Sequence, residues 1–414
     1  MSAALPRGSP SLLRRLNSVA VLRAIRGEGP LSRAELARRT GLSKPTVNDV
    51  VEFLLTSGYV REQVGDGEGR PRRPGRRARL LSFRSDLGHV LGIDVGADKV
   101  LALVADLDGE VLASERRKTA GRDRRSAKAL IGLVEDAARR VIDAAGLRPD
   151  GLMAAGVGTP GIVDRDSGRI TLAPQLGDWE GIELGPTLER SFGCPVLVEN
   201  EVRLSLLAER WRGAARTITD AFFVQLGVGI GGGVLIGGEV YRGASGAAGE
   251  IGYVPLFSAE PAPDGLGPFE HAAGGAAFAR LAREAVAAGD GGALLERAAG
   301  NPEAIDAELV FAVASEGDGT AQRIVDQLVE RLAQGIAAAV VVLNPSTVIV
   351  GGGLSRAGRS LLVPLERRIT ELVPVAPRVV LSELADGGVA LGALRLALQT
   401  VEERLFDLAG AQSV

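Results

Sequence analysis

Three stretches near the N-terminus place apolar residues at helical spacing, which predicts three short helices. The first stretch carries its apolar residues at Leu12, Leu16, Val19, Ala20 and Ile25. It stops at Gly27 and Gly29. The second stretch begins at Ser32, has Glu35 three residues later and stops at Gly41, which is the pattern of a capping box followed by a helix end.

The third stretch begins at Ser43 as an N-cap, has Pro45 in its first turn and stops at Gly58. Its apolar residues share one face: Val47, Val50, Val51 and Leu54. The opposite face then exposes Lys44, Pro45, Asn48 and Asp49, with Thr46 at its margin. Two helices joined by a tight glycine-containing turn predict a helix-turn-helix. In a major groove, Asn48 can read adenine through two hydrogen bonds, while Lys44 and Thr46 reach phosphate or a base edge. The alternative is a helical hairpin that packs on another protein.

Two strand-like segments, 59–64 and 78–83, follow the third helix and flank an arginine-rich turn. The arginines are Arg70, Arg72, Arg73, Arg76 and Arg77, with Arg79 just beyond. We interpret the turn as a wing whose arginines face the DNA backbone or a narrow minor groove, and a solvated linker is the alternative. Residues 1–90 hold 17 Lys and Arg against 8 Asp and Glu, whereas the remainder holds 31 against 43. Such a basic head on an acidic body is expected if only the head meets DNA.

The pattern after residue 87 alternates between β-rich runs and helical runs, which predicts an α/β body. Three β-rich runs come first, separated by turns at 96–98 and 108–109, with Asp94 at the end of the first run. Helices are expected over 124–145 and 202–211, and strands near 153–157, 195–199 and 347–350. Two further strands flank the start of a glycine-rich segment, 226–238, which has seven glycines in thirteen residues. Glycines allow a backbone to approach a phosphate closely, and a second cluster at 351–353 is placed for the same role.

Composition limits the possible class of protein. A chain of 414 residues favours two or three domains, and we expect a head over 1–86 and a body over 87–414. The single cysteine, Cys194, excludes a disulfide framework and fits a reducing compartment. No run of about 18 apolar residues occurs and the N-terminus lacks the apolar core of a signal peptide, so a cytoplasmic protein is expected.

Five strings of residues, in their order and spacing, resemble the ROK family, which is named for repressors, open reading frames and kinases. The strings are GIDVGADK (92–99), GVGTPGIVD (156–164), VENEVRLSLLAE (198–209), LGVGIGGGVLIGGEVYRGASGAAGEIGY (226–253) and IVGGGL (349–354). The resemblance covers nearly the whole chain, because many ROK repressors carry a winged helix ahead of a sugar-kinase-like body. It implies a two-lobed body of the sugar-kinase and actin-like ATPase type, which is ribonuclease H-like, with a cleft between the lobes. It assigns the nucleotide site to Asp94, Gly96, Asp98, Gly227, Val228, Gly229 and Gly352.

This sequence departs from the family pattern at three positions, two that lie near the phosphate in the kinases and one that supplies their catalytic base. Asp98 stands where the kinases have a threonine near the transferred phosphate, and Val228 replaces the threonine of a Gly-Thr-Gly segment. Two like charges about 4 Å apart repel by roughly 4 kcal/mol at an effective dielectric of 20, close to a thousandfold in affinity. Glu201 replaces the aspartate that serves the family as catalytic base, which moves the carboxylate by one methylene. We therefore expect a degenerate nucleotide site and no catalysis, with weak residual kinase activity left open.

The family's zinc ligands are also replaced. Tyr253 stands for the histidine, and Pro261, Pro263 and Pro268 stand for the three cysteines, so no thiolate zinc site and no cofactor are expected. The resemblance still assigns sugar binding to Asn200, Glu201, Glu250, Tyr253 and Glu270. Carboxylates and an amide suit a neutral polyol, whereas solvated or loop-capping glutamates are the alternative.

The hypothesis that best unites these features is a transcriptional regulator of carbohydrate genes, most readily a repressor. Its expected partners are a double-stranded DNA operator and a sugar or sugar phosphate effector, with no membrane. A homodimer or homotetramer is expected, because half-sites mirror a dimer's symmetry. The alternatives are an ATP-dependent, glucokinase-like sugar kinase fused to a DNA-binding domain, and a regulator that answers to a protein partner.

Overall fold

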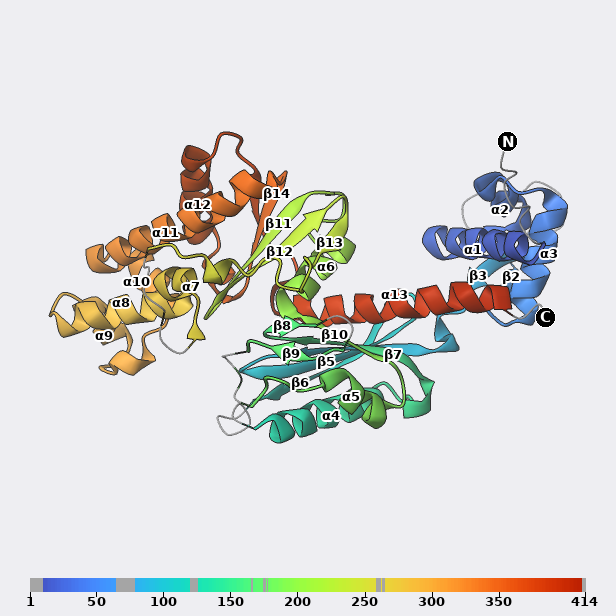
Figure 1. Cartoon of the computed structure of the whole chain (residues 1–414), viewed down its shortest axis with the longest axis horizontal. Coiled ribbons are helices and arrows are strands. Elements are labelled where there is room, and N and C mark those ends of the chain that lie inside the picture. Colours follow the sequence, from blue (N-terminus) through green and yellow to red (C-terminus); the bar gives the residue numbers. More distant parts are fainter. Residues whose placement is uncertain are drawn as a thin grey trace, which may run out of the picture.

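The computed structural model describes residues 10–64, 79–119, 126–164, 167–173, 176, 178–257, 262 and 265–411. Within these ranges the chain forms a small head and a body of two lobes (Figure 1). The predicted architecture, a winged helix-turn-helix ahead of a two-lobed α/β body, is confirmed. Among the described helices, none combines the length and the apolar character needed to cross a bilayer.

The head contains the three predicted helices and a small sheet. Its elements are α1 (Pro10–Glu28), β1 (Leu31–Ser32), α2 (Arg33–Thr40), α3 (Lys44–Thr56), β2 (Val60–Val64) and β3 (Arg79–Phe83). The sheet order is β1-β3-β2, with antiparallel pairs. Ser32 and Glu35 form the predicted capping box, and Ser43 caps α3. The wing arginines Arg70, Arg72, Arg73, Arg76 and Arg77 lie outside the described residues.

The apolar face predicted for α1 is wrong in its first half. Leu16 is 56% exposed, whereas Val21, Leu22 and Ile25 are buried. Among the α1 side chains that the structure describes, the apolar ones that pack on the rest of the head and on the body lie in its second half, so the apolar spacing of the first half does not report burial. In α3, by contrast, the four predicted apolar residues are all buried.

The first lobe is built on a five-stranded sheet whose order is β10-β7-β4-β5-β6. Its strands are β4 (His89–Val95), β5 (Lys99–Asp106), β6 (Val111–Lys118), β7 (Leu152–Thr159) and β10 (Val196–Asn200). Its other elements are η1 (Ser85–Leu87), α4 (Ala127–Ala144), η3 (Pro149–Gly151), β8 (Ile162–Val163), β9 (Ile170–Thr171), α5 (Leu184–Phe192), η8 (Ala385–Gly387) and α13 (Gly388–Ala411). Helices α4 and α5 cover one face of this sheet and α13 covers the other.

The second lobe repeats the same strand order as β13-β12-β11-β14-β15. Its strands are β11 (Ala221–Leu226), β12 (Ile230–Ile236), β13 (Glu239–Tyr241), β14 (Thr347–Gly351) and β15 (Arg378–Leu381). Its helices are η4 (Ile251–Tyr253), α7 (Pro268–Ala273), α8 (Gly275–Ala287), α9 (Gly292–Arg297), η6 (Pro302–Ala304), α10 (Ala307–Ser315), α11 (Gly319–Leu343), η7 (Gly353–Ala357) and α12 (Arg359–Leu372). Helix α6 (Glu201–Arg212) contacts strands of both lobes and packs on α13. In each sheet the first three strands are antiparallel and two parallel strands follow, as in a ribonuclease H-like fold.

Helix α13 packs directly on backbone atoms of its neighbours. A Cβ added to Gly156 of β7 would come within 2.1 Å of the carbonyl oxygen of Ala393, and one added to Gly392 would come within 1.9 Å of that of Leu204 in α6. Both glycines therefore allow a close approach that a larger residue would prevent.

The far end of α13 packs on the head. Val21, Leu22 and Ile25 of α1 share one hydrophobic core with Leu398 and Val401 of α13. Figure 1 shows this long helix running from the junction of the lobes to the head. Helix α13 thus connects the junction of the lobes to the head, which holds the predicted recognition helix α3. The sequence did not indicate this contact.

The same contact includes an arginine. Arg26 of α1 forms an ion pair with Glu402 of α13, at 2.7 Å, and lies 3.5 Å from Asp108. Its guanidinium also lies 5.4 Å from the centre of the Phe83 ring. Arg26 therefore links the head to both α13 and the β5–β6 turn.

Candidate functional site: two adjoining cavities between the lobes

Two cavities adjoin between the lobes and share six lining residues: Ala97, Asp98, Glu201, Gln225, Gly227 and Val228. The inner cavity has a volume of about 210 Å³, and the cleft cavity has a volume of about 530 Å³. A third space of about 680 Å³ continues outward between α8, α10 and η7.

The inner cavity brings together all five residues that the sequence predicted for sugar binding. They are Asn200, Glu201, Glu250, Tyr253 and Glu270. They come from the β10–α6 junction, from η4 and the residue before it, and from α7. Residues far apart in sequence thus line one cavity, although their role in binding stays a prediction.

Asn200 also serves the fold. Its Oδ1 accepts hydrogen bonds from the backbone N–H groups of Val202 (2.9 Å) and Arg203 (3.3 Å), and its Nδ2 donates to the carbonyl oxygen of Gly161 (2.9 Å). The side chain is therefore the N-cap of α6, and only its second amide hydrogen is left to reach a ligand.

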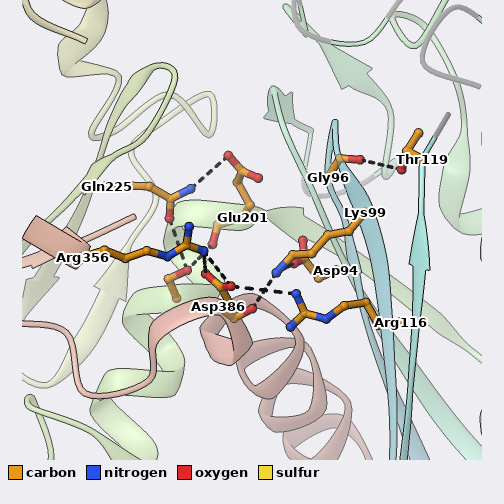
Figure 2. Close-up of polar contacts among 10 residues, drawn as sticks. Asp94, Gly96, Lys99, Arg116, Thr119, Glu201, Gln225, Arg356 and Asp386 are labelled. Atoms are coloured by element: carbon orange, nitrogen blue, oxygen red, sulfur yellow. Dashed lines mark hydrogen bonds and ion pairs between the residues drawn. The ribbon is translucent and has the colours of Figure 1, made fainter. Parts of the chain in front are cut away.

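Glu201 carries a proton at neutral pH. Burial raises the pKa of its carboxyl to about 8, and the neighbouring carboxylates of Asp94 and Glu250 add to this shift. Gln225 Nε2 donates to Glu201 Oε1 at 3.1 Å, as Figure 2 shows. A protonated carboxyl can both donate and accept a hydrogen bond, which suits a hydroxyl-bearing ligand.

The other two carboxyls of the inner cavity are shifted in the same direction. Burial, together with the charge of Glu270, raises the pKa of Glu250, while nearby Arg203 opposes the shift. Burial also raises the pKa of Glu270, whose Oε2 accepts a hydrogen bond from the backbone N–H of Gly267 (3.4 Å). Glu270 therefore both lines the cavity and caps the start of α7, so the loop-capping alternative describes part of its role.

Tyr253 holds the loop that precedes α7. Its hydroxyl donates to the carbonyl oxygen of Gly265 at 3.1 Å, within the segment where the family places its zinc ligands. Pro268 begins α7, whereas Pro261 and Pro263 lie outside the described residues. Within the described ranges, no group of three or more His, Cys, Asp or Glu side chains is arranged to hold a metal ion.

A buried ion-pair cluster behind the inner cavity was not predicted from the sequence. Glu199 accepts from Arg203 Nε (2.7 Å) and Arg242 Nε (2.6 Å), and it also accepts from the backbone N–H of Asn200 (2.8 Å). Burial tends to raise the pKa of Glu199, but the two guanidinium groups outweigh it and lower the pKa. Arg203 is only 2% exposed and also donates to the carbonyl oxygen of Gly246. The cluster fixes the residue immediately before Asn200, and the Glu-Asn string was its only signal.

The cleft cavity contains six of the seven residues predicted for the nucleotide site. Asp94, Gly96, Asp98, Gly227, Val228 and Gly352 line it, whereas Gly229 lines the inner cavity. Val228 is 71% exposed and presents an apolar side chain where the family has a hydroxyl. Gly352 has a φ of +83°, and a Cβ there would meet the carbonyl oxygen of Leu226.

Asp94 lies at the base of this cavity. Its Oδ2 is 3.7 Å from Lys99 Nζ, and burial raises its pKa to about 6 although Lys99 opposes the shift. The turn after β4 is closed by a hydrogen bond from the backbone N–H of Gly96 to the carbonyl oxygen of Lys99 (2.9 Å). The charges of Asp94 and Lys99, which flank this turn, thus partly neutralise each other.

Four further residues of the cleft were missed. Asp386, which precedes α13, forms ion pairs with Arg356 of η7 and Arg116 of β6. Its backbone carbonyl oxygen accepts a hydrogen bond from Lys99 (Figure 2). Only Lys99 was inside a recognised string, and no local pattern marks Asp386 or its two arginine partners as neighbours.

The recognition face of α3 lies as the sequence predicted. Lys44, Pro45, Asn48 and Asp49 are exposed and Thr46 is half-buried. Asn48 Oδ1 accepts a 3.4 Å hydrogen bond from Arg33 Nη1, which leaves its amide group free to donate. The hydroxyls of Ser43 and Thr46 lie 2.8 Å apart at the start of the helix, where backbone N–H groups favour phosphate.

Comparison with known proteins matches the body to the ROK family over residues 90–400 and the head to the MarR family over residues 15–71. The xylose repressor of Caldicellulosiruptor bescii is 29% identical over 399 residues, which cover 94% of this chain and 97% of that protein.

The solved structures that are similar to this chain include a glucokinase and a transcriptional regulator. The crystal structure of a ROK family glucokinase from Streptomyces griseus, in complex with glucose and AMPPNP, is 28% identical, with a TM-score of 0.65, and covers 75% of this chain and 100% of its own. A ROK family transcriptional regulator, a homologue of the E. coli MLC protein, shares the fold over 96% of this chain and 99% of its own, at 23% identity and a TM-score of 0.75.

The raised pKa of Glu201 predicts how stability depends on pH. The folded state keeps this proton up to a pH of about 8, whereas an unfolded chain releases it near 4.5, so this group's contribution to stability falls as the pH rises between these values. Glu201→Gln should therefore gain stability relative to the unmodified protein as the pH rises from about 5 to about 8. Denaturant unfolding across this range measures the difference, with Glu239→Gln as an exposed control. If Glu201→Gln and the unmodified protein differed by the same free energy of unfolding at every pH, the raised pKa of Glu201 would be contradicted.

Proposed function

Because this chain belongs to the ROK family and carries a MarR-type winged-helix head, we propose that it is a DNA-binding transcriptional regulator of carbohydrate genes, acting as a repressor. In this proposal a sugar in the inner cavity is the effector, and no phosphate is transferred. The observation that carries the proposal is the presence, in one chain, of an exposed recognition-helix face and a small carboxylate-lined cavity.

The head supports DNA binding through shape and charge. Helix α3 buries one face and exposes Lys44 and Asn48, while the N-cap Ser43 is exposed and Thr46 is half-buried. A helix placed in this way enters a major groove with its N-terminal residues at the base edges. The excess of Lys and Arg before residue 90 supplies the attraction to phosphate. The wing arginines add to it in this proposal.

The inner cavity supports an uncharged sugar. Its lining combines Glu201, Glu250 and Glu270 with Asn200 and Tyr253, and among its described lining residues there is no Lys, Arg or His. Hydroxyl groups can donate to carboxylate oxygens and accept from the protonated carboxyl of Glu201, whereas the phosphate of a sugar phosphate would meet a lining with four acidic side chains and no cation among its described residues. A neutral monosaccharide is therefore the preferred effector class.

The three changed positions support a loss of kinase chemistry. Asp98 and Val228 line the cleft where phosphate oxygens would lie, and Glu201 is held protonated by its surroundings. A general base must be deprotonated and placed within reach of the hydroxyl, so these substitutions act against transfer. The body then serves as a sensor, and a ligand regulates the head only if it binds two arrangements of the protein with different affinity.

The head residues predict separable effects on DNA binding. Asn48→Ala should cost about 1–3 kcal/mol at the preferred base and relax specificity there, and Lys44→Ala should weaken binding to all sequences and lower the salt slope by about 1. Selection of bound DNA fragments, followed by fluorescence anisotropy at several salt concentrations, measures both. Lys128→Ala, on the exposed face of α4, is the control. If neither head variant differs from the control, α3 is not the reading helix.

The cavity residues predict sugar-dependent stabilisation. A neutral sugar at 100 times its dissociation constant should add about 2.7 kcal/mol to the free energy of unfolding, and its phosphorylated form should add less at equal concentration. Glu250→Gln should reduce this gain, whereas the exposed control Glu239→Gln should keep it. Thermal-shift measurements with xylose, glucose, N-acetylglucosamine and their phosphates provide the test. Equal shifts for Glu250→Gln and its control would exclude this cavity as the sugar site.

A second candidate function is sugar phosphorylation, which the likeness to a glucokinase solved with glucose and AMPPNP favours. We expect the unmodified protein to form no ADP from Mg-ATP beyond the sugar-free background. The combined substitution Asp98→Thr, Glu201→Asp and Val228→Thr restores the family's residues and should raise turnover. Coupled ADP assays compare the two proteins, and sugar-dependent turnover by the unmodified protein would favour the kinase.

A further inference from the structure

The segment between β15 and α13 is held by charged groups from both lobes. Arg356 of η7, in the second lobe, donates to both carboxylate oxygens of Asp386, each at 2.8 Å. Lys99 of β5, in the first lobe, donates to the backbone carbonyl oxygen of Asp386 at 2.8 Å, and Arg116 Nη1 lies 3.9 Å from Asp386 Oδ2. Figure 2 shows the three cations converging on this residue.

This arrangement lies in the cavity whose lining includes the residues predicted for the nucleotide site. Arg116, Lys99, Arg356 and Asp386 all line the cleft cavity together with the glycines predicted for the nucleotide site. Partial burial tends to raise the pKa of Asp386, but its cationic neighbours outweigh burial and lower it, so the carboxylate stays ionised at neutral pH. Charge-assisted hydrogen bonds of this kind are shorter and stronger than neutral ones.

A second anchor holds the same segment on its other side. Glu209, a buried residue of α6, accepts hydrogen bonds from the backbone N–H groups of Glu383 (3.1 Å) and Leu384 (3.4 Å). The segment 382–387 is thus bonded to β5, α6 and η7 at once, and it is one of two covalent connections between the lobes, since α6 and residues 213–220 form the other. We call segment 382–387 the hinge segment.

The hinge segment leads directly into α13, which ends on the head. The helix has 24 residues and so spans about 36 Å, and its far end packs on α1 through the shared core and the Arg26–Glu402 ion pair. A change in the hinge segment therefore changes how the second lobe lies relative to the unit formed by the first lobe, α13 and the head.

We propose that Asp386 is an internal counter-ion that ties the two lobes together in place of a nucleotide phosphate and sets the angle between the second lobe and the head-bearing unit. Its regulatory meaning rests on the proposed function, whereas its effect on the lobes does not. Arg356 and Asp386 are both partly exposed, and an exposed ion pair shifts an equilibrium by at most about fivefold. A shift of that size is enough to make the lobes responsive to a ligand.

The distance between the lobes tests this proposal. Spin labels at Lys128→Cys on α4 and Glu296→Cys on α9 report lobe opening, since both positions are exposed and the one native cysteine, Cys194, is buried. In this background, Asp386→Asn should increase the population of long distances by about two- to fivefold. Glu383→Gln, whose exposed carboxylate faces Arg216 at 4.0 Å, is the matched control and should leave the distribution unchanged.

Two further measurements keep the proposal falsifiable. Arg356→Gln should produce the same shift, and the double variant should add nothing to either single change, because both remove one interaction. Raising the salt concentration to about 1 M should move the unmodified protein toward the Asp386→Asn distribution and leave that variant unchanged. If Asp386→Asn matches the Glu383→Gln control, or if the two single shifts add, the counter-ion role is wrong. None of these measurements uses DNA or sugar, so their failure leaves the proposed function intact and the reverse also holds.

Discussion

The backbone contact of α13 with its neighbours is the constraint on which the rest of the structure depends. Gly156 and Gly392 bring this helix so close to β7 and α6 that an added methyl group on either one would collide with a carbonyl oxygen. A helix seated in this way cannot slide or tilt without disturbing the first lobe. Because its far end shares a core with α1, the head is carried by the first lobe, and the second lobe is the part left to move.

The residues predicted to bind sugar lie between the lobes, where a movement of the second lobe would change their spacing. The inner cavity takes Asn200 and Glu201 from the base of α6, and Glu250, Tyr253 and Glu270 from the second lobe. A sugar that contacts both sets binds best when the lobes hold them together. Asn200 is also the N-cap of α6, and α6 packs on α13. A sugar that contacts Asn200 therefore acts on α6, which touches the helix that packs on the head.

Local features of the fold could be predicted from the sequence because short-range chemistry determines them. Ser32 and Ser43 cap their helices as expected, since a cap depends on residues within a few positions, and the apolar spacing of α3 marks the face that the rest of the head covers. The predicted members of the two cavities were found only through the resemblance to the family. Asp386 and Arg116 were not, because the strands and helices that bring them together are far apart in the chain. Leu16 was misplaced because helical spacing indicates a helix but not which part of it another element covers.

In the proposed function, sugar and DNA act on the same two arrangements of the protein, which makes their effects reciprocal. The most direct test is calorimetric titration of the stabilising sugar into the protein with head and body together, alone and saturated with its selected DNA fragment. The account predicts that DNA lowers the affinity for the sugar by the same factor by which the sugar lowers the affinity for DNA. An identical sugar affinity in the presence and absence of DNA would contradict it.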